Sequence, residues 1–88
     1  MWHLNKVTAS FTAHLPRAAQ NNFDTFQNAI HNLGIHPRDA AQMLGSADYK
    51  RLGTSDQYQI RLSGSERATF LVDTATRTVT ILQVGGHT

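Results

Sequence analysis

Apolar residues recur at helical spacing in the first half of the chain. Four of them, three or four positions apart, form one apolar stripe: Phe23, Phe26, Ile30 and Leu33. Pro16 precedes the stripe and suits a first helical turn, while Gly34 follows it and tolerates the left-handed conformation at a helix end. This pattern predicts a helix over 16–33, followed by a second, shorter helix over 37–44.

Alternation between apolar and polar residues predicts the strands. Residues 6–11 alternate, which indicates a short N-terminal strand that buries Val7 and its alternate neighbours. A polar loop follows the helices over 45–57, with a short strand at 49–52 inside it. From Tyr58 the period is two again. The second half therefore predicts three antiparallel strands in a meander, at 58–62, 67–73 and 78–84.

The order of elements is one strand, two helices and then three strands. This order predicts an α+β fold in which the helices pack on one face of the sheet. The 88 residues suffice for one domain, which we place at 1–88. A domain of this size buries roughly 60–65 % of its unfolded surface, so its core is thin and a partner would add stability.

Composition narrows the class of protein. Apolar residues make up 40 % of the chain and charged residues 16 %, as in a soluble globular protein. The net charge is +2 and the pI is near 9.5, which mildly favours a polyanionic partner. The absence of cysteine excludes disulfides and thiolate chemistry. The chain shows no signal peptide and no run of ~20 apolar residues, so we expect a cytoplasmic protein with no membrane partner.

The first hairpin of the meander places two arginines opposite each other. With a three-residue loop at 63–65, Arg61 pairs with Arg67, and the large apolar pairs share the other face. The remaining pairs in this register are Leu62 with Glu66, Ile60 with Ala68 and Tyr58 with Phe70. Like charges in such a pair cost about a few tenths of a kcal/mol, and an anion lying across both guanidinium groups relieves that cost. The structural alternative is two solvated arginines that splay apart, screened by Glu66.

His87 is the candidate group for proton transfer. In the second hairpin Phe70 faces Ile81 and Val72 faces Val79, which brings Arg67 near Val84 at the end of the last strand. His87 follows two glycines, which let the backbone bend toward the same edge. Histidine titrates near neutrality and suits general acid–base work on a phosphodiester. A frayed terminal histidine is the structural alternative.

Other polar residues of this half are candidates for contacts to RNA. They are Lys50, Arg51, Gln59 and Arg77. The five histidines show no metal-ligand spacing, so we expect neither a metal nor another cofactor. The chain also contains no glycine-rich phosphate loop and no serine-triad motif. Any catalysis would therefore rest on the arginine pair and His87.

The second half of the chain contains a series of short motifs in a fixed order. They are Tyr49-Lys50-Arg51-Leu52, then Tyr58-Gln59-Ile60-Arg61-Leu62, a glycine turn, Glu66-Arg67-Ala68-Thr69-Phe70, and an apolar strand ending in Val84-Gly85-Gly86-His87. Over about residues 49–88 this series resembles the RelE/ParE toxin superfamily. Members read as a Leu-Lys-like loop, Tyr-x-Ile/Val-Arg, a turn, Tyr-Arg-x-x-Tyr/Phe, and a last strand followed by Val-Gly-His-Arg. The resemblance implies a two-helix hairpin on a curved antiparallel sheet.

The resemblance also implies a function. It implies the toxin of a toxin–antitoxin pair, which an antitoxin protein neutralises, and an endoribonuclease that cuts mRNA without a metal, usually on the ribosome. Arg61 and Arg67 match strand positions that are basic in such members, and His87 matches the region of the catalytic group on the last strand. Two alternatives remain: a ParE-like toxin without chemistry of its own that inhibits DNA gyrase, and a module whose basic edge binds only its antitoxin. Thr88 stands where arginine follows the histidine in that family, which favours the alternatives, whereas the opposed arginines favour the ribonuclease.

Overall fold

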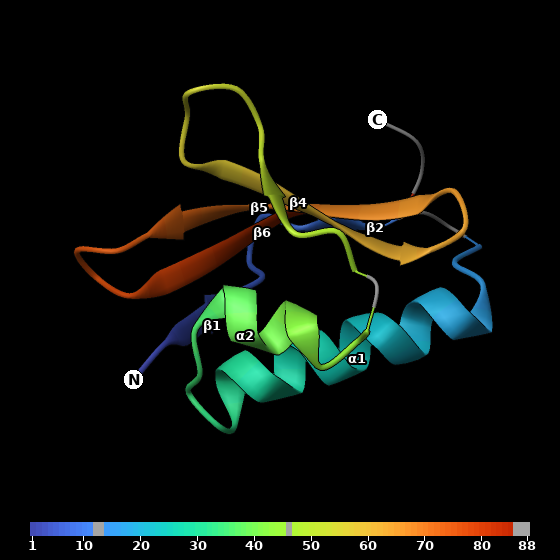
Figure 1. The fold of residues 1–88 in the computed structure, drawn as a ribbon, viewed down its shortest axis with the longest axis horizontal. Helices are drawn as coiled ribbons and strands as arrows, with labels where there is room; N and C mark the ends of the chain where they lie inside the picture. Colours follow the sequence, from blue (N-terminus) through green and yellow to red (C-terminus); the bar gives the residue numbers. More distant parts are fainter. Residues whose placement is uncertain (12–13, 46, 86–88) are drawn as a thin grey trace.

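In the part of the chain that the structure describes, two helices lie on one face of a six-stranded sheet, which confirms the α+β class that the sequence predicts (Figure 1). The computed structural model describes residues 1–11, 14–45 and 47–85. The helices are α1 (Arg17–His31) and α2 (Pro37–Gln42). The strands are β1 (His3–Asn5), β2 (Ser10–Phe11), β3 (Lys50–Arg51), β4 (Gln57–Ser63), β5 (Glu66–Asp73) and β6 (Thr78–Val84). Neither helix of this described part is long and apolar enough to cross a membrane.

The sheet is mixed rather than purely antiparallel. Its strand order is β1-β6-β5-β4-β3, and β2 also pairs with β6. The predicted meander of β4, β5 and β6 is confirmed as antiparallel, and β3 adds to it at one edge. At the other edge β1 and β2 both run parallel to β6, an orientation that no local pattern in the sequence indicates. These parallel pairs differ from the antiparallel sheet that the sequence resemblance implies.

The prediction of a single N-terminal strand over 6–11 is wrong. Two short strands stand in its place, separated by a turn in which the Ala9 N–H donates to the Lys6 carbonyl. The Asn5 side chain accepts from the Val7 N–H, which favours this turn over extended backbone. Val7, expected to be buried, is 90 % exposed at the turn. The alternation over 6–11 is too short to outweigh this local hydrogen bonding.

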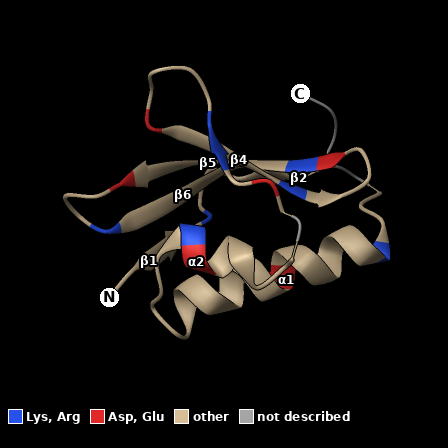
Figure 2. Cartoon of the chain, viewed as in Figure 1, with Lys and Arg blue, Asp and Glu red and all other residues tan. Residues whose placement is uncertain are grey.

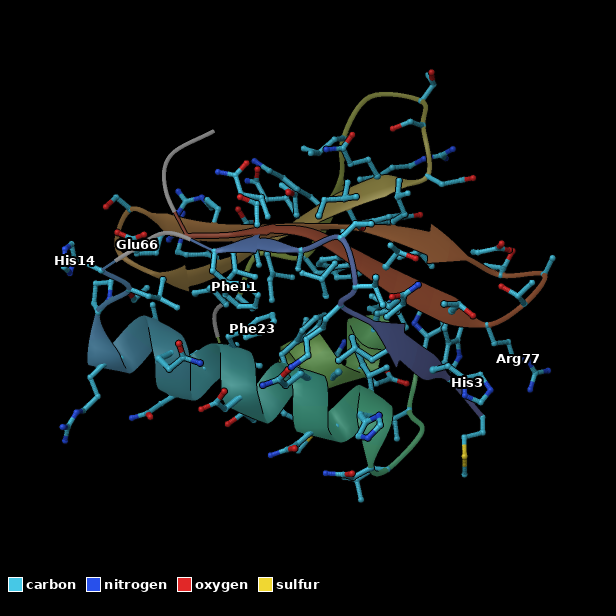
Figure 3. All side chains as sticks on the ribbon, turned by 180° about the vertical axis from the view of Figure 1, so that it is seen from behind. His3, Phe11, His14, Phe23, Glu66 and Arg77 are labelled. Carbon is cyan, nitrogen blue, oxygen red and sulfur yellow. The ribbon has the colours of Figure 1, made fainter. Side chains whose placement is uncertain are left out.

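The core lies between α1 and the meander. The predicted stripe residues Phe23, Phe26 and Ile30 are buried against the sheet, and Figure 3 shows Phe23 pointing toward the strands. Leu33, expected in the same stripe, is 61 % exposed because α1 ends at His31 and no further turn carries it to the sheet. Gly34 adopts φ +67° there and closes the helix end, as its position in the sequence predicts.

An aromatic cluster joins the second half to α1. The Phe70 ring lies 5.2 Å from that of Phe26 and 6.4 Å from that of Tyr58, measured between ring centroids. Tyr58 in turn stacks on Tyr49 at 5.1 Å with 26° between the ring planes. Because Phe70 is fully buried and touches all of these rings, it connects the helix, the central strands and the loop before β3.

His36 begins α2. Its Nδ1 accepts a hydrogen bond of 3.0 Å from the Arg38 N–H, and Pro37 occupies the first helical position. The ring also meets Trp2 edge-on, with 4.7 Å between centroids. Partial burial, helped by the Arg38 charge, holds the pKa of His36 below its ordinary value of 6.5. The folded state therefore favours the neutral ring that can accept this bond.

Stability should fall as the pH drops through and below 6.5. The unfolded chain takes up a proton at His36 more readily than the folded chain, because the pKa is lower in the folded state, so protonation favours unfolding. His36→Asn keeps a capping acceptor and removes the titration. We expect the melting temperature to fall less between pH 7 and pH 5 in His36→Asn than in the wild type. His14→Asn, at an exposed position, serves as the matched control; equal pH dependence in all three proteins would contradict this role of His36.

The β4–β5 hairpin has the predicted register except at its tip. Arg61 opposes Arg67, Ile60 opposes Ala68 and Tyr58 opposes Phe70, as the pattern predicts. The prediction of a three-residue loop is wrong, because Ser63 pairs with Glu66 around a tighter turn. A bulge lies between Arg61 and Ser63. The bulge keeps Leu62 buried and points its carbonyl at the Asn22 amide of α1, which donates to it. Burial of Leu62 thus decides the geometry of the tip.

The β5–β6 hairpin contains a second bulge. Phe70 pairs with Ile81 and Val72 with Val79, as predicted, but the register shifts by one between Thr69 and Phe70. The last strand therefore sets Val84 opposite Ala68, not beside Arg67 as expected. Gly85 takes that place, and its N–H donates to the Arg67 carbonyl at 2.6 Å.

Candidate nucleic-acid interface

The sheet face away from the helices carries the candidate site. Ile60 and Ala68 pack toward the helices and are fully buried, so their neighbours along β4 and β5 point to the opposite side. In Figure 1 both helices lie on one side of the sheet, which leaves that second side without a helical cover. We call it the open face and define it by five residues that cross-strand pairing brings together: Lys50, Gln59, Arg61, Arg67 and Thr69.

The two central arginines of the open face differ in their environment. The Arg61 side chain is exposed and makes no hydrogen bond or ion pair with any described residue. The Arg67 side chain is half-buried, and its Nη1 donates to the carbonyls of Gly64 (3.0 Å) and Glu66 (3.3 Å). Arg67 therefore ties down the hairpin turn, while Arg61 is available to an anion. Carbonyl dipoles offset part of the like-charge repulsion that the sequence predicts for this pair.

Lys50, Gln59 and Thr69 form a polar row beside the arginines. Lys50 pairs with Gln59 across β3 and β4, and Gln59 pairs with Thr69 across β4 and β5. Lys50 is exposed, whereas Gln59 and Thr69 are only 6 % and 5 % exposed. Figure 2 shows the resulting basic segments on β3 and near the β4–β5 turn. Thr69 was not among the predicted site residues, although the Arg61–Arg67 register already implies that it faces Gln59.

Two predicted RNA contacts do not join this row. Arg51 pairs with Tyr58, so it belongs to the other face, and its guanidinium donates to the carbonyls of Thr54 (2.9 Å) and Ser55 (2.7 Å). Arg77 lies in the β5–β6 turn with a left-handed backbone, φ +53°. Figure 3 shows Arg77 beside His3 at one end of the sheet and Glu66 at the other end. Arg51 thus stabilises the loop before β4, and Arg77 is remote from the arginine pair.

His87 lies outside the described residues, so its predicted role remains a prediction. The strand that leads to it does reach the site, since Gly85 is hydrogen-bonded to Arg67. Only one residue separates Gly85 from His87 in the chain. Gly85 adopts φ +94°, a conformation that favours glycine and turns the backbone where β6 ends.

The open face offers two exposed cationic side chains to an anionic ligand. Arg61 and Lys50 supply exposed positive charge, whereas Gln59 and Thr69 are buried between the strands. Within the described ranges, no three His, Asp or Glu side chains gather in a group that could hold a metal ion. This arrangement suits contacts to a phosphate backbone, to which Arg and Lys contribute most of the affinity.

Comparison with known proteins adds no family to this geometry. No family model matches the chain, and a search of curated proteins finds no match to it. What the open face does is therefore inferred from its own residues and their placement.

Proposed function

We propose that the chain is the toxin of a toxin–antitoxin pair and cleaves mRNA as a metal-independent endoribonuclease. The observation that supports this most is the pairing of Arg61 with Arg67 on a sheet face that no helix covers, with Lys50 nearby. A purely structural sheet gains nothing from two like charges in direct opposition. A phosphodiester lying across the strands would be held by both guanidinium groups.

The proposed reaction is attack of a ribose 2′-hydroxyl on the adjacent phosphorus. The bond from phosphorus to the 5′-oxygen breaks, leaving a 2′,3′-cyclic phosphate and a 5′-hydroxyl. Arg61 and Arg67 would hold the phosphate and stabilise the charge that develops on it in the transition state. His87, three residues after the end of β6 in the sequence, would move the proton.

A toxin of this kind would have an antitoxin as its partner and would act in the cytoplasm. A cognate antitoxin would neutralise the protein by covering the open face or by displacing an element beside it, and mRNA on the ribosome would place the protein in the cytoplasm. The thin core of a small domain also favours a stabilising partner. The remaining candidates are a gyrase inhibitor and a module that binds only its antitoxin, and both require the open face to act without chemistry.

Expression of the chain alone in bacteria should arrest growth, and co-expression of the antitoxin gene should relieve the arrest. Purified protein added to a cell-free translation reaction should produce new 5′ ends within the translated message, mapped by primer extension. The control is the Arg61→Ala protein at equal concentration, which should leave the message intact.

Three other outcomes separate the candidates. Intact message together with gyrase-trapped DNA breaks would assign the protein to the gyrase inhibitors. Normal growth with abundant folded protein would reject a toxin altogether. An antitoxin that binds away from the open face and leaves it accessible would contradict the proposed mode of neutralisation.

A further inference from the structure

A separate pocket of about 310 Å³ lies between α2 and the loop that leads to β3. Three small residues line it, namely Ala41, Gly45 and Ala47. A Cβ built on Gly45 would meet no atom within 4 Å, so the space there is open. The remaining lining residues are polar, and none of them belongs to the open face.

The backbone around this pocket is held in place. Gly45 has φ +85°, and Asp48 has φ +54°, an uncommon conformation for a residue other than glycine. The Ala47 carbonyl accepts a hydrogen bond from the Arg61 N–H, which joins the loop to β4. Ala47 is 4 % exposed and belongs to the core. Ala47, on the described part of this loop, is therefore held against the core beside the pocket.

The polar side chains of this pocket do not satisfy one another. Those lining it are Arg38, Gln42, Asp48 and Tyr49. None of the four makes a side-chain hydrogen bond or ion pair with another residue of the described ranges. Arg38 and Asp48 carry opposite charges on one pocket and yet form no ion pair there. Both side chains are exposed, so a ligand that accepts from Arg38 and donates to Asp48 can reach them.

A second hollow in the described part of the chain has different surroundings. It has a volume of about 260 Å³ and lies near β1 and α1. There the Lys6 ammonium donates to the Gln27 side chain at 2.8 Å, and Gln27 donates to Asp24 at 3.0 Å. Lys6 and Gln27 are thus engaged within the protein, whereas the polar side chains of the pocket at α2 bond to no described residue.

Tyr49 supplies a fixed aromatic wall. Its ring stacks on Tyr58, which stacks on the buried Phe70, so the ring cannot turn freely. Burial raises the pKa of the Tyr49 hydroxyl to about 12. The phenol therefore keeps its proton at neutral pH and can donate as well as accept a hydrogen bond.

We propose that this pocket binds a nucleobase and prefers guanine. Arg38 offers a guanidinium group, which pairs well with the O6 and N7 acceptors of guanine. The ionised carboxylate of Asp48 can only accept hydrogen bonds. Guanine presents two adjacent donors to it, N1–H and the N2 amino group. Adenine, cytosine and uracil lack this donor pair. A planar base also matches the aromatic wall, and the volume lies at the small end of ligand pockets.

The choice of an RNA base as ligand rests on the proposed function, since a protein that cuts RNA must also place the bases near the cut. The pocket would then add base selectivity to the phosphate contacts of the open face. The loop joins the two sites directly, because Ala47 lines the pocket and is hydrogen-bonded to the backbone of Arg61.

The test uses mononucleotides and does not require cleavage. The purified 88-residue chain is titrated with GMP, AMP, CMP and UMP up to about 10 mM, and binding is followed by the amide signals of residues 42–49 in NMR spectra. We expect GMP to bind at least about tenfold more tightly than the other three. Asp48→Asn should remove about tenfold of the GMP affinity, since it loses the carboxylate but retains a residue that tolerates the left-handed backbone. Asp39→Asn, an exposed neighbour on α2 outside the pocket, should bind GMP like the wild type.

Several results would overturn the pocket proposal. These are no GMP binding, equal binding of all four nucleotides, or equal losses in Asp48→Asn and Asp39→Asn. Melting curves establish that each variant is folded. A chain that binds GMP in this way but leaves mRNA intact would reject the ribonuclease and keep the pocket. A chain that cuts mRNA but does not bind GMP would keep the ribonuclease and reject the pocket.

Discussion

Arg61→Ala should lose most of the toxicity and RNA cleavage, by about 10²-fold or more, while the fold is kept. The loss follows if Arg61 stabilises charge on the phosphate in the transition state, by analogy with removal of one charge-stabilising donor elsewhere. The fold should be unaffected because the side chain is exposed and bonded to no described residue, and its removal relieves a like-charge contact. Cleavage rate, growth arrest and thermal melting are measured on the same preparations.

The matched variants sharpen this test. Arg17→Ala removes one positive charge at the exposed start of α1 and should leave activity unchanged. Arg61→Lys keeps the positive charge but loses the bidentate guanidinium donor, so its cleavage activity should also be low. Arg67→Ala should lose activity as well, but it also removes the hydrogen bonds to the turn and should melt slightly earlier.

Two outcomes would reject the site on the open face. Folded Arg61→Ala protein with full toxicity would show that this arginine contacts no essential phosphate. Equal losses in Arg61→Ala and Arg17→Ala would show that only the net charge matters, as in non-specific attraction to a polyanion.

Phe70→Ala should destabilise the protein by about 3–5 kcal/mol, the range for removing a buried aromatic ring. Phe70 is fully buried and contacts the rings of Phe26, Tyr58 and Tyr49. Small domains are stable by about 5–15 kcal/mol in total, so this loss threatens the folded state. The melting temperature should fall by on the order of 20 °C for a chain of this length. Chemical denaturation gives the free energy of unfolding directly.

The neighbouring residue provides the control for Phe70. Leu71 lies on the same strand but points to the opposite side and is 39 % exposed. Leu71→Ala should therefore change the free energy of unfolding by only about 0.5 kcal/mol. Similar losses for the two variants would contradict the view that the aromatic cluster joins α1 to the sheet.

The sequence by itself determined the elements whose period runs over many residues. Phe23, Phe26 and Ile30 recur often enough to define the buried face of α1, and alternation over 58–84 defines the three strands of the meander. The opposition of Arg61 and Arg67 was also predictable, since burial of one face allows a single register on either side of the turn. These features are local, because spacing along the chain sets which side chains share a face.

Only the tertiary structure decided how the edges and connections are built. The parallel pairing of β1 and β2 with β6 depends on contacts between segments about 75 residues apart, for which no local pattern exists. Bulges lie at Leu62 and near Thr69, where burying apolar side chains stabilises the fold more than an unbroken ladder of backbone hydrogen bonds would. The pocket at α2 joins residues of a helix with a loop in which Asp48 has a left-handed backbone. Such conformations are imposed by the surrounding packing, and no spacing of residue types predicts them.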